Sequence, residues 1–317
     1  MNILAFGKDG QLGKAFQNLF QKVPLASENN IQYIGRNQCD LSHAIALNNL
    51  LNTSKPDLII NAAAYTAVDK AETEYELAFA INAKAPEIMA QYATKHGSTL
   101  LHYSTDYVFD GSKDGPYIED DHRKPINMYG KSKAAGEEAI VNVFTNCSAG
   151  QYAIFRTSWV YGDGANFIRT ILRLAKEREE LKVICDQYGV PTNAGWLAQV
   201  SLDLVLDLQD NLRKFTSGIY HAVPSGKTSW HELAALVVQT ARDANIALKL
   251  KPHDIQSILA AQYPVVAPGS ANSCLDNSKL RLALEESGDM SKLQHWNKAW
   301  EKEVQSYVAG LSRDGLI

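Results

Sequence analysis

Tyr129 and Lys133 are the residues of this chain whose types and spacing first suggest a reaction. A spacing of four positions places both side chains on one face of a helix, because residues i and i+4 are neighbours on a helical surface. An ammonium beside a phenol stabilises the phenolate and makes the tyrosine a usable acid, as a ketone-reducing site requires. The same spacing also occurs by chance on exposed helices, so the surrounding elements decide between the two interpretations.

A glycine-rich turn, Gly7-Lys8-Asp9-Gly10-Gln11-Leu12-Gly13, follows an apolar run over residues 2–6 and leads into a helical pattern over about 10–21. A strand, a glycine turn and a helix N-terminus together hold a pyrophosphate through backbone N–H groups. Glycine is needed where a side chain would block the phosphates or the contact between helix and strand. The position of this turn at the first strand–helix junction favours a dinucleotide site over a simple tight turn.

Short apolar runs then alternate with helical patterns. Further strands are expected at about 31–34, 56–64, 98–104 and 152–156, with helices at 40–54, a long one ending near His96-Gly97, and 127–146. This order predicts an α/β fold, a Rossmann-type doubly wound parallel sheet with helices on both faces. We expect residues 1–160 to form the dinucleotide-binding domain.

The second half of the chain is less repetitive. Helices are expected at about 165–178, 196–209 and 229–244, and strands at 181–184 and 218–221, the last strand of the chain. We expect residues 161–317 to form mostly a smaller C-terminal α/β lobe that binds substrate, with some segments returning to the Rossmann sheet.

Arg36 follows the second predicted strand, where an acidic residue would bind the adenosine 2′-hydroxyl. An arginine can pair with a 2′-phosphate instead, which favours NADPH, with NADH as the alternative. Asp40 comes next, either as the cap of the 40–54 helix or beside the adenine. Thr105 and Asp106 lie just past the fourth strand, where open α/β sheets bind ligands.

Composition excludes several classes of protein. The net charge of −4 gives no signal for nucleic acid or an anionic membrane, and no apolar run approaches the ~20 residues of a membrane helix. The apolar N-terminus lacks a basic leader and is interpreted as a first strand rather than a signal peptide. The four cysteines are scattered without a Cys-x-x-Cys pair, so we expect free thiols, no zinc site and a cytoplasmic location.

Several motifs stand in the order of one family: Gly7-x-x-Gly10-x-x-Gly13, Asn61-Ala62-Ala63-Ala64, Ser104-Thr105-Asp106-Tyr107-Val108-Phe109-Asp110-Gly111, Tyr129-x-x-x-Lys133 and Arg156-Thr157-Ser158-Trp159-Val160-Tyr161. Through them the chain resembles the extended short-chain dehydrogenases/reductases over residues 1 to about 300. Residues 61–72, 186–192 and 271–275 are most similar to the members that reduce the 4-keto group of a dTDP-6-deoxy sugar and complete dTDP-L-rhamnose.

The resemblance implies a role for each motif. Thr105, Tyr129 and Lys133 would be catalytic, and Thr105, Asp106 and Trp159 would contact the dTDP-sugar. With Arg36 added, the expected cofactor-binding residues are Gly7, Gly10, Gln11, Leu12, Gly13, Arg36, Asp40, Leu41, Ala62, Ala63, Ala64, Thr66, Tyr129 and Lys133.

The chain departs from its relatives at two places. Ala15 stands where related bacterial reductases can carry a glutamate that helps bind magnesium at a dimer interface, so we expect no metal. Gly269-Ser270 replace an Arg-Pro that often precedes the Asn-Ser-x-Leu motif. The protein itself is expected to be a monomer or a homodimer.

One related function is disfavoured and three stay open. Sugar-nucleotide 4,6-dehydratases typically have Asp-Glu after the threonine, and Asp106-Tyr107 here disfavours their elimination chemistry. The alternatives are another nucleotide-sugar 4-reductase, a C4-epimerase using the same Tyr/Lys pair, and a non-catalytic regulatory subunit such as the partner of methionine adenosyltransferase. Intact Thr105, Tyr129 and Lys133 argue against the last of these.

Overall fold

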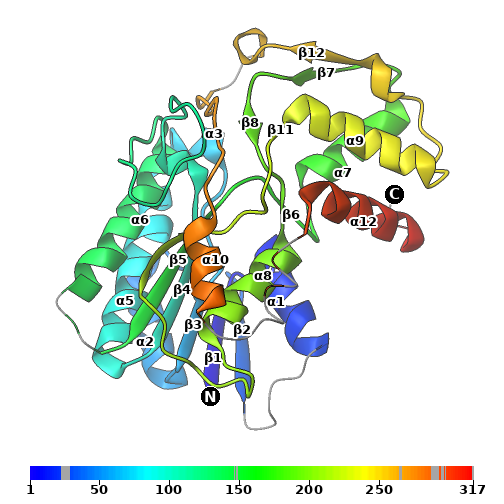
Figure 1. Ribbon diagram of the computed structural model, residues 1–317. Helices are drawn as coiled ribbons and strands as arrows, with labels where there is room; N and C mark the ends of the chain where they lie inside the picture. The colour runs from blue at the N-terminus through cyan, green and yellow to red at the C-terminus, as the bar shows by residue number, and fades with distance from the viewer. Residues whose placement is uncertain are drawn as a thin grey trace.

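The computed structural model has a parallel sheet with helices on both faces and a smaller lobe beyond one end of the strands (Figure 1). It describes residues 1–22, 29–145, 147, 149–263, 266–286, 293, 296 and 298–315. In spatial order the sheet contains β10 (Gly218–His221), β5 (Gln151–Thr157), β4 (Thr99–Thr105), β3 (Leu58–Asn61), β1 (Asn2–Phe6) and β2 (Asn30–Ile34). All neighbouring strands are parallel, which confirms the predicted Rossmann-type fold.

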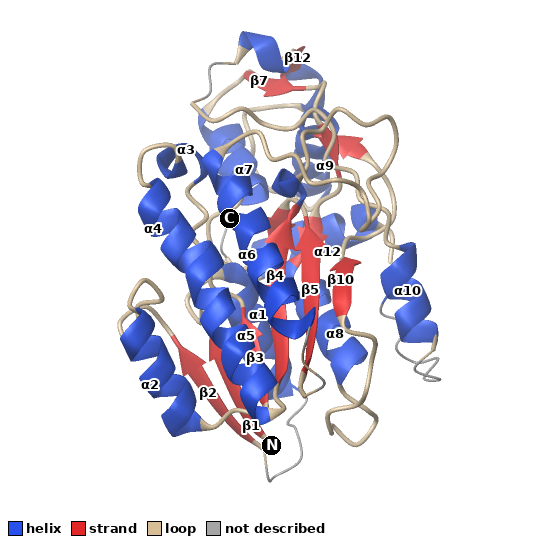
Figure 2. Ribbon diagram, turned by 90° about the vertical axis from the view of Figure 1, so that its left-hand side faces the viewer, coloured by secondary structure: helices blue, strands red, loops and turns tan. Residues whose placement is uncertain are grey.

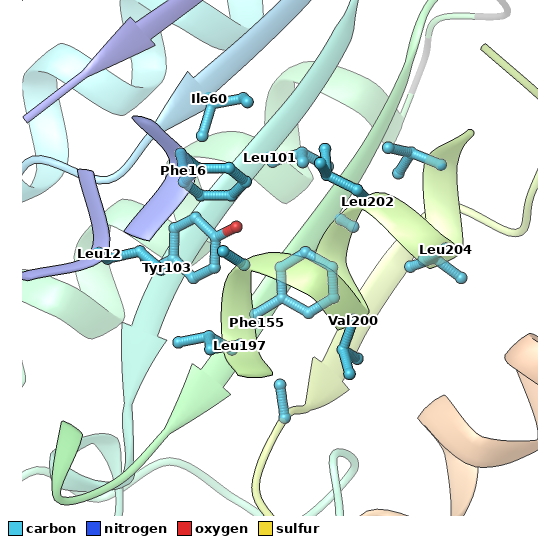
Figure 3. Packing of buried hydrophobic residues seen from close by; sticks show 14 of the residues in the cluster. Leu12, Phe16, Ile60, Leu101, Tyr103, Phe155, Leu197, Val200, Leu202 and Leu204 are labelled. Carbon is cyan, nitrogen blue, oxygen red and sulfur yellow. The ribbon is translucent and has the colours of Figure 1, made fainter. Parts of the chain in front are cut away.

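Each face of the sheet is covered by its own helices. One face packs against α2 (Ala44–Ser54), α5 (Ala85–His96) and α6 (Met128–Thr145) (Figure 2). The other face packs against α1 (Gln11–Lys22), α8 (Ala194–Val205) and α10 (Ser278–Glu285). Figure 3 shows this second face, where Phe16 of α1 and Leu197 of α8 surround Tyr103 and Phe155 of the sheet. Burial on both faces explains the nearly continuous apolar runs of the strands.

The lobe has a separate apolar core. It contains α7 (Phe167–Glu177), α9 (Trp230–Asp243) and α12 (Trp300–Arg313), with the strand pairs β6 (Val160–Tyr161) with β9 (Thr192–Asn193), β7 (Leu181–Ile184) with β12 (Ile255–Ile258), and β8 (Tyr188–Gly189) with β11 (Thr228–Ser229). Between these segments the chain returns to the sheet to form β10. Within the described ranges, no helix is long and apolar enough to cross a lipid bilayer.

Two predicted helices differ from the structure. Asp40 does not open a helix, because α2 begins at Ala44 with His43 at the N-cap. The Asp40 carboxylate instead accepts hydrogen bonds from the backbone N–H and the hydroxyl of Ser42, at 2.9 and 2.8 Å. A short polar side chain that bonds two residues ahead favours a turn over a helix, which explains the error.

The long helix predicted to end near His96 is interrupted. It consists of α3 (Val68–Ala71), α4 (Tyr75–Phe79), the π-helix η1 (Ala80–Lys84) and α5, and Gly97 ends α5 with φ at 73° as predicted. The strand at 218–221 is not the last, since β12 follows it. Asn146, the predicted end of the next helix, lies outside the described residues.

Candidate functional site

A cleft of about 850 Å³ lies at the carboxyl ends of the sheet strands and reaches the lobe. Phe6, Ala62 and Thr105 line it from the ends of β1, β3 and β4, while Trp159 and Trp230 line it from the other side. Of the residues predicted from the sequence for cofactor, substrate and catalysis, all but Gly13 line this cleft. The structure therefore gathers residues that are up to about half the chain apart in sequence.

The glycine turn after β1 lines the cleft and packs its backbone tightly against the loop after β3, forming a cradle at the start of α1. Gly7 has φ at 84°, and a Cβ there would lie 2.7 Å from the carbonyl carbon of Ala62 and the nitrogen of Ala63. A Cβ on Gly13 would overlap the Gly7 carbonyl, so Gly13 permits close packing of α1 against the turn instead of facing the cleft. A cradle of this kind, at the N-terminus of α1, fits a pyrophosphate.

Arg36 and Asp40, which follow β2, both line the cleft. The Arg36 Nε lies 3.2 Å from the Asp40 Oδ2, and the arginine side chain is 73% exposed. The backbone N–H of Ser42 contributes most to lowering the pKa of Asp40, against burial, and Arg36 lowers it further. Arg36 is thus an exposed cation beside a carboxylate, and its pairing with a 2′-phosphate stays a prediction.

Tyr129 lies in the first turn of α6 and faces Thr105. Asn127 accepts a hydrogen bond from the Gly130 N–H at 2.8 Å, which fixes the start of this helix. The Tyr129 phenol hydrogen-bonds to the Thr105 side chain. Thr105 in turn donates to the Asp106 Oδ1 at 3.0 Å. The phenol, the hydroxyl and the carboxyl group therefore form a short chain along the cleft wall.

Burial is the main cause of the pKa shifts of Asp106 and Tyr129. It raises the pKa of the Asp106 carboxyl to about 6. Burial, and then the charge of Asp106, raise the pKa of the Tyr129 phenol well above its usual range. Tyr129 therefore carries its proton at neutral pH. Lys133 was expected to lower the pKa of Tyr129, but in this structure burial outweighs any such effect.

The Lys133 ammonium is held from beneath the cleft. Its Nζ donates to the Tyr103 carbonyl at 2.6 Å and lies 3.4 Å from the His102 Nε2, and the side chain is 1% exposed. Burial lowers the pKa of Lys133 to about 8, and the charge of Glu137 opposes this shift. Lys133 still lines the cleft, so its remaining hydrogen-bonding capacity faces the ligand space.

Glu137, one turn after Lys133, fastens α6 to β5. Its two carboxylate oxygens accept hydrogen bonds from Nε and Nη2 of Arg156, at 2.9 and 2.7 Å, and both side chains are buried. Arg156 also donates to the Glu119 carbonyl at 3.1 Å, and its Nη1 lies 3.4 Å from the His221 Nε2 of β10. This ion pair fixes the helix that carries Tyr129 and Lys133, two of the three predicted catalytic residues.

Asn82, in the π-helix η1, is a buried residue that supports the elements around the cleft and was not predicted from the sequence. Its Oδ1 accepts from the Tyr65 N–H at 2.9 Å, and its Nδ2 donates to the Tyr65 carbonyl and the Ser132 hydroxyl, both at 3.0 Å. It thereby ties the loop after β3 to α6. The available signal was a polar residue on the apolar face of a predicted helix.

Trp230, at the start of α9, was also missed. Its indole stacks on that of Trp159 with ring centroids 3.5 Å apart and an interplanar angle of 15°. Trp159 has φ at 47°, and Gly189 leaves room for its ring, since a Cβ there would lie 2.7 Å from it. The two indoles give the cleft a flat aromatic wall on the lobe side, which suits a planar or sugar-containing ligand.

Comparison with known proteins connects this geometry to one family. A family model described as the RmlD substrate binding domain matches residues 1–309. The dTDP-4-dehydrorhamnose reductase of Salmonella typhimurium is 43% identical over 283 residues, covering 89% of this chain and 91% of that protein. Its counterpart from Escherichia coli K12 is also 43% identical, over 286 residues, with the same coverage.

Solved structures agree. A dTDP-4-dehydrorhamnose reductase from Clostridium acetobutylicum superimposes with a TM-score of 0.83 at 31% identity, covering 98% of this chain and 100% of that chain. The Bacillus anthracis reductase, crystallised in complex with NADP, gives a TM-score of 0.79 at 31% identity, covering 96% and 97%.

Proposed function

The chain belongs to the family of the RmlD substrate-binding domain, and we propose that it reduces the 4-keto group of dTDP-6-deoxy-L-lyxo-4-hexulose with NADPH to give dTDP-L-rhamnose. This is the reaction of dTDP-4-dehydrorhamnose reductase, the enzyme that the motifs of this chain resemble and for which the relatives are named. The observation that carries the proposal is the placement of Tyr129, Thr105 and Lys133 at one cleft with the glycine cradle.

The cofactor site fits a nicotinamide dinucleotide. The cradle at Gly7 and Gly10 would hold the pyrophosphate, and Ala62 to Ala64 with Thr66 would line its path. When bound, the reduced nicotinamide supplies the hydride that a ketone needs. Arg36 supports NADPH over NADH, in agreement with the NADP bound to the Bacillus anthracis relative.

Tyr129 is the acid of the reaction. Its half-buried phenol keeps its proton at neutral pH and gives it to the carbonyl oxygen as negative charge develops there. The Thr105 hydroxyl, which donates to Asp106 in this structure, would turn to donate a second hydrogen bond to the same oxygen. Lys133 supplies the positive charge that stabilises the resulting phenolate and would bind the hydroxyls of the nicotinamide ribose.

The substrate end is expected to use Asp106 and Trp159, with Trp230 completing the aromatic wall. The tyrosine that follows Asp106 supports reduction over elimination, because elimination needs a second carboxyl group there. A C4-epimerase would use the same Tyr129 and Lys133 but would return its cofactor unchanged. Net consumption of the cofactor therefore separates these two functions.

Several expectations stay predictions. They are the division into domains at 1–160 and 161–317, the monomeric or homodimeric state, the lack of a metal and the cytoplasmic location. The free thiols of Cys39, Cys147, Cys185 and Cys274 support a reducing compartment.

The decisive experiment incubates the protein with dTDP-6-deoxy-L-lyxo-4-hexulose and either NADPH or NADH, and follows the nicotinamide absorbance and the sugar product. Cofactor consumption with dTDP-L-rhamnose as product supports the proposal. Interconversion of C4 epimers without net consumption would establish an epimerase instead. Inertness toward every 4-keto sugar nucleotide would favour the non-catalytic alternative.

A further inference from the structure

Three buried polar side chains form a line beneath the catalytic helix. Asn61 on β3 lies opposite His102 on β4, and the Asn61 Nδ2 is 3.0 Å from the His102 Nδ1. On the other side of the ring, the His102 Nε2 is 3.4 Å from the Lys133 Nζ. All three residues are 1% exposed. A line of polar groups this deeply buried costs stability unless its donors and acceptors match.

His102 is the side chain that meets the Lys133 ammonium from the sheet. Among the described residues, Lys133 forms no ion pair with a carboxylate, and Glu137, one turn along the helix, bonds instead to Arg156 and Arg123. From η1, the neighbouring polar side chain is the neutral Asn82, which bonds Ser132. Besides His102, the Lys133 Nζ has the Tyr103 carbonyl as its acceptor.

The proton positions along the line follow from simple hydrogen-bond chemistry. An ammonium only donates, so the His102 Nε2 must present a lone pair to Lys133. The imidazole then carries its proton on Nδ1 and donates it to the Asn61 side-chain oxygen, which faces the ring when the amide is turned by 180°. With the amide nitrogen toward the ring instead, Nε2 would carry the proton and confront the ammonium with a second donor.

We propose that His102, oriented by Asn61, is a positioning residue that holds Lys133 as an ammonium directed at the cleft. The inference rests on the proposed function of Lys133 in reduction. His102 does not touch the substrate; it acts by accepting a hydrogen bond from the ammonium. Burial and the charge of Lys133 hold the pKa of His102 well below its usual value, so the ring stays neutral and keeps the lone pair.

Two substitutions of His102 distinguish the role of Nε2 from that of Nδ1. In His102→Gln the side-chain amide reaches about as far as Nε2 and can still accept from Lys133, whereas in His102→Asn it reaches only as far as Nδ1. The dependence of kcat on pH is measured in the same way for wild type, both variants and His253→Leu. His253→Leu is the control, since His253 is an exposed histidine in the lobe. We expect the alkaline loss of kcat to move down by at least about one pH unit in His102→Asn. His102→Gln and the control should stay near wild type.

A second measurement does not depend on turnover. In the ligand-free wild type, nitrogen-15 NMR of the imidazoles, assigned by the signal lost in His102→Gln, should show His102 neutral with its proton on Nδ1. A proton on Nε2, a charged ring, or identical pH profiles for the Asn and Gln variants would overturn the inference. An inactive wild type would instead refute the proposed function. The NMR result would still test the proton positions along Asn61, His102 and Lys133.

Discussion

Glu137→Gln should destabilise the protein by about 3 kcal/mol, because it leaves the buried guanidinium of Arg156 without its counter-charge. Arg156 is 1% exposed and loses one of two charge-assisted hydrogen bonds, those at 2.9 and 2.7 Å. Removing one partner of a buried pair costs about 3–5 kcal/mol. We take the lower end, since glutamine keeps one acceptor and Arg156 keeps the Glu119 carbonyl.

The assay is urea unfolding at pH 7 followed by tryptophan fluorescence, with Tm measured in parallel. A loss of about 3 kcal/mol corresponds to a Tm lower by roughly 4–5 °C for a chain of this size. Glu138→Gln is the matched control, since Glu138 is the exposed next residue of α6 and should change stability by less than about 0.5 kcal/mol. Equal stability of the two variants would refute the assignment of Glu137 as the anchor of α6.

Removing both charges tests whether the unpaired charge causes the loss of stability. Glu137→Leu combined with Arg156→Met leaves no unpaired buried charge, so the double variant should be more stable than either single one. An additive result, with the double variant the least stable, would mean that packing rather than charge explains the loss.

Four further predictions concern the cleft. Tyr129→Phe should lower kcat by at least about 100-fold while fluorescence titration shows unchanged NADPH binding; near-normal turnover would remove Tyr129 as the acid. Lys133→Met should weaken NADPH binding and lower kcat together, and an effect on neither would exclude it from the site. Arg36→Asp should raise the Kd of NADPH more than that of NADH; equal changes would show that Arg36 does not reach the 2′-phosphate. Burial raises the pKa of Asp106 to about 6, so its protonated form stabilises the fold at low pH, and this stability is lost as pH rises from about 4 to 6. Asp106→Asn cannot ionise, so over that range its free energy of unfolding, measured with urea, should rise by roughly 2–3 kcal/mol relative to wild type.

Local pattern was enough to predict most of the strands. The strands at 181–184 and 218–221 have the predicted bounds, because apolar runs between turns carry their own signal. The interruption of the helix before Gly97 was not predictable in this way. In the π-helix at Ala80–Lys84, Asn82 bonds to Tyr65 and Ser132, and contacts of this kind between segments distant in sequence leave no local pattern.

The site shows the same division. The positions of Tyr129, Lys133 and Thr105 at one cleft follow from motifs that each lie in one short segment. Trp230 joins Trp159 only through the fold of the lobe, so no local pattern distinguishes it from any aromatic at a helix start. The direction of the Tyr129 pKa shift was equally unpredictable from the sequence, since burial and not the nearby ammonium dominates it.

The origin of β10 has a consequence for biosynthesis. The Rossmann sheet takes its sixth strand from residues 218–221, and His221 on that strand lies beside Arg156. During translation, β5 therefore leaves the ribosome with an open hydrogen-bonding edge and waits for about sixty more residues before its neighbour arrives. The nascent dinucleotide-binding half is exposed to edge-to-edge association throughout that interval, in which only the first part of the lobe, from β6 to β9, is made.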